Sequence, residues 1–126
     1  MKFFKIIKEI KSKEGILHFQ RYAIFESKFL SIYIHTFTQP DKDNYEHDHP
    51  WNFLLLILKG GYIEQSNNIK YIRNPGFIKF IRGEHRHKII ELNRKKSISI
   101  AICGKRKREW GYHIDNGWVS NLDFRK

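Results

Sequence analysis

Two histidines separated by a single residue are the side chains of this sequence best suited to chemistry. His47 and His49 lie in the segment 46–51, which reads EHDHPW. In an extended chain, side chains at positions i and i+2 point the same way and stand about 7 Å apart along the strand. Two imidazoles on one face can therefore converge on a metal ion, and the apolar residues that follow on that face, from Trp51 to Ile57, would shield the ion from water.

A metal site also needs a ligand from another part of the chain. The segment 84–87, which reads EHRH, offers His85 and His87, and a hairpin would return it to the same end of a barrel. Three histidines that leave coordination positions open are typical of a reactive metal site rather than a structural one. A histidine pair is also compatible with surface residues or with a packed core pair, so the pattern alone does not decide.

The elements that must position these histidines have the pattern of β-strands. Short apolar or alternating runs recur between turn residues such as Asn-Pro-Gly at 74–76. This regular spacing predicts a closed all-β sandwich or barrel. The eight predicted strands span residues 16–25, 29–38, 49–58, 62–65, 69–73, 77–81, 88–92 and 97–103.

Residues 1–15 follow a different period. Phe3, Ile6, Ile7 and Ile10 recur at spacings of three and four, with lysines between them. This pattern is typical of a short amphipathic helix. We expect the helix to end near residue 15 and to cap the side of a single barrel domain formed by residues 16–126.

The composition narrows the class of protein. The chain has 126 residues, enough for one domain, and its 40% hydrophobic and 15% aromatic residues suit a packed β fold. Cys103 is the only cysteine, which excludes an internal disulfide and a cysteine-rich zinc site and favours a cytoplasmic location. No apolar run approaches the length of a membrane span or of the core of a signal peptide.

Positive charge is concentrated in three segments of the chain. The formal net charge is +11, and lysines and arginines gather in residues 2–13, 94–96 and 105–108. Such segments attract phosphate-bearing partners, nucleic acid first among them. The plainer interpretation is a solvated surface of turns, so charge alone does not identify a partner.

Two spacings of glycine and histidine match known motifs. His47, His49 and Gly61 fall at the spacing of the first cupin motif, and Gly76, followed after five residues by the segment 82–87, falls at that of the second. The sequence therefore resembles the cupin superfamily, and more closely a subgroup of small, uncharacterised bacterial and phage proteins that carry His-Asp-His-Pro-Trp. Further marks of this subgroup stand at residues 35–37, 40–41, 60–64, 87–89, 104–111 and 117–118.

This resemblance implies a cupin-type double-stranded β-helix, that is, a jelly-roll barrel, with a metal site. The register of the second motif makes His87 the third ligand beside the first pair and leaves His85 as an alternate. The glutamate of the first motif is replaced by Phe53 or Leu54, so the usual fourth protein ligand is absent. A three-histidine site, like that of the cysteine-dioxygenase-like cupins, is the implied substitute.

The implied cofactor is one divalent transition metal ion, with Fe(II) expected first and Zn, Mn or Ni as alternatives. His35 is a further candidate ligand, because Tyr33, His35 and Phe37 share one strand face; a hydrogen bond to a ligand is the milder alternative. Four acidic residues near the pair are candidates to accept a hydrogen bond from the second ring nitrogen of a histidine: Asp41, Asp43, Glu46 and Asp48. Strand alternation points Asp48 away from the pair, which favours a role for it in a turn or cap.

These features favour an oxygenase-like enzyme, an oxidoreductase with a non-haem metal, that acts on a small anionic substrate. A guanidinium fork binds a carboxylate or phosphate at two points, and an aromatic face stacks on a ring. We therefore expect the substrate at Arg82, Arg108 and Trp110, with Arg106 nearby. A module that binds nucleic acid or a phosphorylated ligand is the alternative, a phage protein that contacts a host component is a third, and a homodimer is an open possibility.

Overall fold

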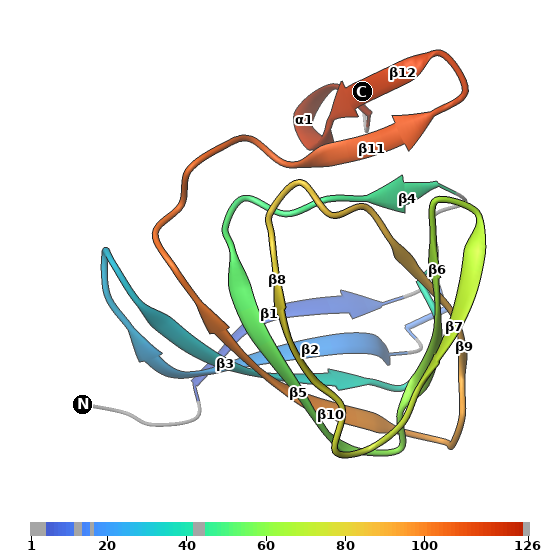
Figure 1. Ribbon diagram of the computed structural model, residues 1–126. Helices are drawn as coiled ribbons and strands as arrows, with labels where there is room; N and C mark the ends of the chain where they lie inside the picture. The colour runs from blue at the N-terminus through green and yellow to red at the C-terminus, as the bar shows by residue number, and fades with distance from the viewer. Residues whose placement is uncertain (1–4, 12–13, 16, 42–44, 125–126) are drawn as a thin grey trace.

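The structure, a computed structural model, describes residues 5–11, 14–15, 17–41 and 45–124. Over these residues the chain forms twelve strands and one short helix, and the strands make three antiparallel sheets (Figure 1). The all-β prediction is confirmed. The helix, α1 (Asn121–Phe124), is far too short to cross a membrane, and no other helix occurs in the described ranges.

The largest sheet supplies most of the barrel wall. Its strands alternate buried and half-buried residues, as a strand with one face on a core requires, and the sequence SISIAIC of β10 does so most regularly. The strand β10 pairs with β3 on one side and with β5 on the other, so strands distant in sequence lie side by side. The order is β1 (Lys5–Lys11), β2 (Leu17–Glu26), β3 (Ser31–Phe37), β10 (Ser97–Cys103), β5 (Phe53–Lys59) and β8 (Ile78–Ile81).

Two smaller sheets complete the architecture. The first contains β7 (Ile69–Arg73), β6 (Tyr62–Ser66) and β9 (Lys88–Leu92). The second contains β12 (Gly117–Ser120), β11 (Gly111–Ile114) and β4 (Glu46–His47), and lies above the barrel with α1 in Figure 1. The pairing of β4 with the much later β11 is the kind of non-sequential connection that a jelly roll requires.

The core lies on the inner face of the largest sheet. Ile57, Leu55 and Phe53 of β5 are buried there and pair in register with Ser99, Ala101 and Cys103 of β10. Because the inward side chains of β10 are all small, this part of the barrel cannot be filled completely by its own wall. A cavity results, and the candidate site described below lies in it.

The predicted N-terminal helix is wrong, because residues 5–11 form the strand β1. β1 pairs with the edge of β2, and a register shift between Ile6 and Lys8 interrupts strict alternation, which is why the apolar spacing resembled that of a helix. A helix of about three turns is marginal in water, whereas the edge of β2 offers unpaired backbone groups. Isoleucine, with its branched Cβ, also favours the strand.

All eight predicted strands are present, and the bounds 69–73, 88–92 and 97–103 agree with the structure. The strands β4, β11 and β12 were not predicted. β4 has two residues, and β11 and β12 have four each, so none offers a run long enough to show alternation.

Asp48 fastens the C-terminal hairpin to the barrel. Its side chain is only 1% exposed, and it accepts hydrogen bonds from Gly111 N (2.7 Å), Trp118 Nε1 (2.9 Å) and His113 Nε2 (3.1 Å). Arg108 Nη1 lies 3.0 Å from Asp48 Oδ1 as an ion pair. Asp48 is therefore a buried anchor rather than the simple turn or cap residue expected from the sequence.

We predict that Asp48→Ala lowers the free energy of unfolding by about 3 kcal/mol, because it leaves a half-buried guanidinium and three further donors without their acceptor. Urea unfolding measures the loss, and limited proteolysis should cut first between residues 104 and 120. Asp115→Ala, in the exposed β11–β12 turn, is the matched control and should change stability by less than about 0.5 kcal/mol. Equal stability of the two variants would contradict the anchoring role.

Candidate metal centre

The backbone itself brings two of the predicted ligands together. His47 N donates to His87 O (2.8 Å) and His87 N donates to His47 O (2.9 Å), so the two residues form an antiparallel bridge. In such a pair the Cα atoms lie about 5.5 Å apart and both side chains point to one face. His49 is held nearby because its N–H donates to Gly83 O (2.9 Å), and a Cβ atom on Gly83 would lie only 2.9 Å from His49 O.

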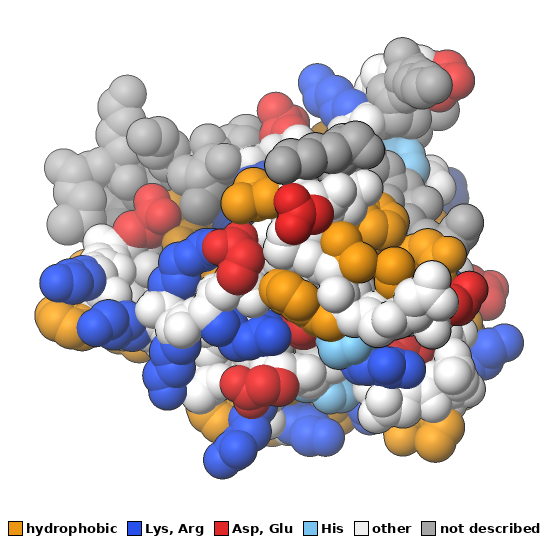
Figure 2. Space-filling model, turned by 90° about the horizontal axis from the view of Figure 1, so that it is seen from above, with side chains coloured by type: hydrophobic (Ala, Val, Ile, Leu, Met, Phe, Trp, Pro, Cys, Tyr) orange, Lys and Arg blue, Asp and Glu red, His pale blue; other side chains and the backbone are white. Residues whose placement is uncertain are grey.

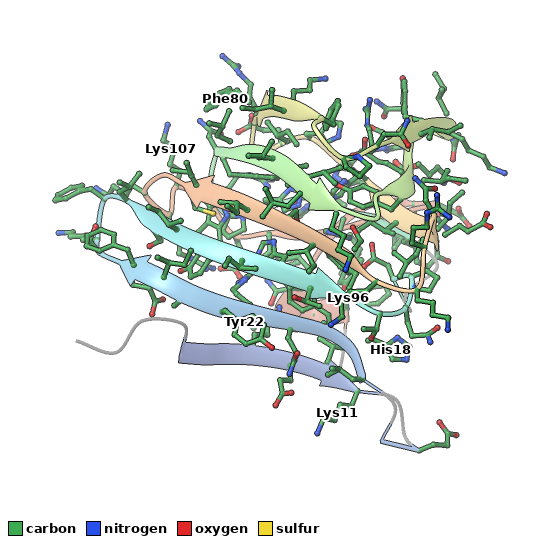
Figure 3. The ribbon with its side chains drawn as sticks, turned by 90° about the horizontal axis from the view of Figure 1, so that it is seen from below. Lys11, His18, Tyr22, Phe80, Lys96 and Lys107 are labelled. Atoms are coloured by element: carbon green, nitrogen blue, oxygen red, sulfur yellow. The ribbon has the colours of Figure 1, made fainter. Side chains whose placement is uncertain are left out.

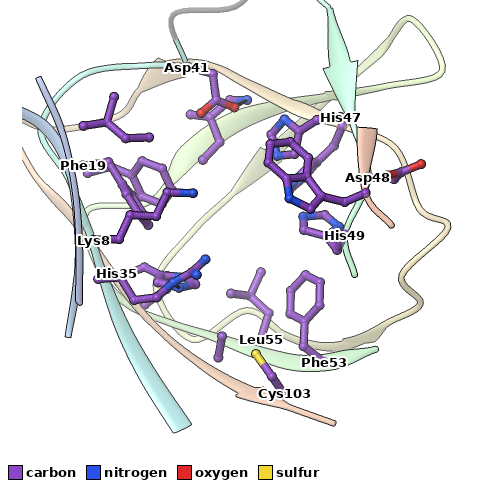
Figure 4. Close-up of a pocket in the computed structure, with 18 of the residues that line it drawn as sticks. Lys8, Phe19, His35, Asp41, His47, Asp48, His49, Phe53, Leu55 and Cys103 are labelled. Carbon is purple, nitrogen blue, oxygen red and sulfur yellow. Dashed lines mark hydrogen bonds between the residues drawn. The ribbon is translucent and has the colours of Figure 1, made fainter. Parts of the chain in front are cut away.

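The three imidazole rings converge inside the barrel, and Figure 4 shows two of them, those of His47 and His49, on one wall. The ring centroids are 5.3 Å apart for His47 and His49, and 4.9 Å apart for His87 and each of the other two. One nitrogen from each ring lies within 4.8 Å of the others. A single ion could contact all three after small side-chain rotations.

His49 is held in its neutral form. Burial lowers the pKa of His49 well below the ordinary histidine value, and the nearby His87 and His47 lower it further. The neutral ring is the form that binds a metal. The electrostatics of the site therefore favour a lone pair, rather than a proton, at this position.

Glu64 orients His87 from behind. Its Oε2 lies 2.5 Å from His87 Nδ1, so that Nδ1 is the protonated nitrogen and Nε2 carries the lone pair. Its Oε1 accepts from Arg73 Nε and Nη2, both at 2.9 Å. Burial would raise the pKa of Glu64, but hydrogen bonds from His85 and His87, with Arg73 beside them, outweigh burial and hold this pKa far below its usual range.

His85 also contacts this carboxylate, through the same oxygen as His87. Its Nε2 is 3.2 Å from Glu64 Oε2, and it belongs with Glu64 and His87 to a second group of close donor atoms, apart from His47 and His49. The alternation that made His85 and His87 equivalent does not apply, because His85 N donates to Arg82 O in a turn. The structure thus groups His87, and not His85, with the first pair.

The triad faces a cavity of about 250 Å³ enclosed by the barrel (Figure 4). The wall near the histidines is aromatic and apolar, with the ring of Phe53 4.8 Å from that of His49 and the ring of Trp110 6.2 Å from that of His47. Cys103 also lines it, and burial raises the pKa of Cys103 to about 12, so the thiol stays protonated. Neither the apolar rings nor the protonated thiol would compete with the three imidazole nitrogens for a metal ion.

Comparison with known proteins identifies the fold. No known family profile matches the chain, and no curated protein matches it in sequence. Among solved structures, the cupin-2 domain Rru_A2000 from Rhodospirillum rubrum is similar with a TM-score of 0.65 and 11% identity, over 97% of this chain and 79% of its own. The chain has the cupin fold.

Two other solved cupin barrels are similar at the same level. A cupin superfamily protein from Desulfitobacterium hafniense DCB-2 has a TM-score of 0.58 and 16% identity, over 79% of this chain and 84% of its own. HppE, crystallised with Fe(II), has a TM-score of 0.64 and 14% identity over 79% of this chain, which spans 56% of the length of HppE. At such identities the likeness concerns the barrel alone.

His35 lies in the cupin barrel but outside the triad. It stands on β3 directly opposite Arg21 of β2, and its Nε2 accepts a hydrogen bond from Arg21 Nε (2.9 Å). Burial, with the charges of Arg21 and Lys8 nearby, lowers the pKa of His35 well below the ordinary histidine value. The nitrogen that accepts from Arg21 is not available to a metal, so the structure does not support His35 as a ligand.

The residues predicted for the substrate rim divide into two groups. Trp110 and Arg106 line the cavity. Arg82 is exposed and borders a separate pocket beside β8, and Arg108 is engaged by Asp48 and by His49 O (3.1 Å). The substrate role of Arg82, Arg108 and Trp110 stays a prediction, because no observation here tests substrate binding.

None of the described acidic residues predicted to hold a ring nitrogen of the triad does so. Asp41 Oδ2 accepts from Ile89 N (2.7 Å), and Glu46 accepts from Asn67 N (2.9 Å) and Arg86 Nε (2.8 Å). Asp48 is the hairpin anchor, and Asp43 lies outside the described residues. Glu64 is the residue that holds His87. The sequence showed it only as the last residue of the segment 60–64, one of the marks of the cupin-like subgroup.

Proposed function

We propose that this cupin barrel binds one divalent transition metal ion through His47, His49 and His87 and acts as a metal-dependent enzyme on a small anionic substrate. The observation that carries the proposal is the convergence of three imidazole rings in one cavity, with the ring of His49 neutral and that of His87 held by a buried carboxylate. Such a set of ligands leaves coordination positions open.

The residues present fit such an ion. Among the described residues, Nδ1 of His49 is buried without a hydrogen-bond partner, a state that costs about 1–3 kcal/mol for a polar group. A carboxylate behind a ligating histidine, as Glu64 is behind His87, is the usual device that sets the tautomer and direction of a metal ligand. Imidazole nitrogens suit Fe, Ni, Zn and Cu in particular.

A bound ion would supply Lewis-acid or redox chemistry, and the side chains of this chain would supply selection and orientation. Phe53 and Trp110 exclude water from the triad, and Glu64 fixes the direction of His87. The cavity of about 250 Å³ has room for a small molecule.

Iron(II) is the metal that we propose first, with dioxygen chemistry as the reaction class and Zn, Mn or Ni as alternatives. One feature supports this choice: HppE, which shares the barrel, was crystallised with Fe(II). The three-histidine set by itself also suits zinc. Hydrolysis or isomerisation would use the same three ligands. The identity of the metal therefore has to be measured before a reaction can be assigned.

We expect the protein, purified without a histidine tag, to retain about one equivalent of a divalent transition metal after dialysis. Elemental analysis after separate loading with Fe(II) under argon, Zn, Mn and Ni measures the stoichiometry. Chelation should lower the melting temperature, because an ion that binds only the folded chain stabilises it. Protein that holds no metal after any of these loadings would refute the proposal.

Two of the basic segments, residues 94–96 and 105–108, lie apart from each other in the structure. Lys96 and Lys107 lie at opposite ends of β10 (Figure 3), and a strand of this length spans about 23 Å. On the face in Figure 2, lysines and arginines are spread among acidic side chains instead of forming a band. Nucleic-acid binding, a homodimer and a host partner stay predictions that no observation here tests.

A further inference from the structure

The cavity contains a cation that the metal site does not use. Arg21 projects from β2 onto the inner face of the largest sheet and lines the same cavity as the triad. Its guanidinium carbon lies 5.1 Å from the ring centroid of Tyr33 and 5.8 Å from those of Trp51 and Phe19. These aromatic faces and the hydrogen bond to His35 confine the guanidinium group to one place.

This guanidinium forms no ion pair with a described residue. The charge of Glu26 acts on it only from beyond ion-pair distance, and its only hydrogen bond to a described residue is that of Nε to His35. The two carboxylates that line the cavity are engaged elsewhere, Asp41 by Ile89 N and Asp48 by Arg108. Arg21 is half-buried, and a charge that is partly removed from water without a close partner is costly.

Arg21 lies across the cavity from the triad, where its charge could bind an anionic group of a ligand. Figure 4 shows His35, the hydrogen-bond partner of Arg21, across the cavity from His47 and His49, with Lys8 and Phe19 on the same side as His35. The triad thus lies on one side of the cavity, and Arg21 lies with His35 and Lys8 on the other. The terminal amino groups of a guanidinium form a planar fork that matches the two oxygens of a carboxylate.

We propose that Arg21 binds the carboxylate group of the small molecule that the cavity accepts, with His35 as the residue that positions its guanidinium. The part of this inference that concerns the opposite, reacting end of the molecule rests on the proposed function. The carboxylate site itself does not, because it is formed without the metal. The anionic substrate expected from the sequence therefore finds its cation on β2 instead of at Arg82 or Arg108.

The test uses butyrate as the probe, with 1-butanol as its neutral counterpart of similar size, and follows the indole signals of the metal-free protein by NMR. We expect saturable binding of butyrate and none of 1-butanol. Arg21→Gln should weaken butyrate binding at least tenfold, and Arg21→Lys, which keeps the charge but loses the fork, should weaken it less. Arg82→Gln, which changes an exposed arginine outside the cavity, should bind butyrate like the wild type.

Metal loading of the same variants separates this inference from the proposed function. One equivalent of metal without any binding of butyrate in the wild type would overturn the inference alone. Butyrate binding that depends on Arg21 in a protein that holds no metal would uphold it and refute the metal-dependent function. If Arg21→Gln folds and binds butyrate as well as the wild type does, Arg21 has only a structural role. If Arg21→Gln does not fold, the same conclusion follows when Arg21→Lys binds butyrate undiminished and 1-butanol also binds.

Discussion

His49→Ala should abolish metal binding under conditions in which the wild type retains about one equivalent. Its ring is neutral and its centroid lies within 5.3 Å of the centroids of the other two, so its removal takes away one of three ligands. The affinity should fall by more than the roughly 10- to 100-fold typical for residues that only support a ligand. Equilibrium dialysis followed by elemental analysis measures the change.

His85→Ala is the matched control, since it removes a histidine of the same segment that also contacts Glu64 but is not grouped with His47 and His49. It should retain the metal, whereas His87→Ala should lose it like His49→Ala. Circular dichroism and thermal melting of each variant show whether the barrel is intact. The assignment of the third ligand would be reversed if His85→Ala lost the metal and His87→Ala kept it.

Glu64→Gln should lower both stability and metal affinity. The carboxylate is 3% exposed and pairs with Arg73 while it accepts from two histidines, so its neutral isostere leaves a buried guanidinium without compensation. We expect a loss of about 3–5 kcal/mol in the free energy of unfolding, as for other broken buried pairs, and a loss of about 10- to 100-fold in metal affinity. Urea unfolding of metal-free protein and dialysis of loaded protein measure the two effects separately.

The pH dependence gives a second test of the same carboxylate. Because the pKa of Glu64 in the folded state lies far below that of an unfolded glutamate, about 4.3, its contribution is fully present above that value and declines as the pH falls through the folded-state pKa. The difference in stability between the wild type and Glu64→Gln should thus be constant from about pH 7 to 5 and shrink below about pH 4. Glu91→Gln, an exposed change on β9, should show no such difference, and a constant difference down to pH 3 would contradict the assigned role.

Sequence spacing could predict the part of the site that depends on local geometry. His47 and His49 are two residues apart, and their convergence follows from that separation. His87 could be chosen over His85 only through a motif, because the turn at Arg82 and the bridge to His47 that distinguish them are tertiary features. The barrel was predictable because eight of its strands carry a clear pattern.

The supporting residues could not be predicted, for a different physical reason. Glu64 reaches His87 only because β6 pairs with β9, and Arg21 enters the cavity only because β2 belongs to the curved sheet of the barrel. In the sequence, Arg21 is one polar residue in a strand that could equally face solvent. Which face of such a strand is inside depends on the closure of the sheets, and no local pattern carries that information.

The bridge between His47 and His87 also determines when the metal site forms during folding. The two residues are far apart in sequence, and closing the loop between them lowers the entropy of the chain before any contact across the loop stabilises it. Pairings of this kind form slowly during folding. A partly folded chain would therefore have no metal centre, and the recovery of metal binding during refolding should coincide with the final closure of the barrel rather than with the earlier formation of its hairpins.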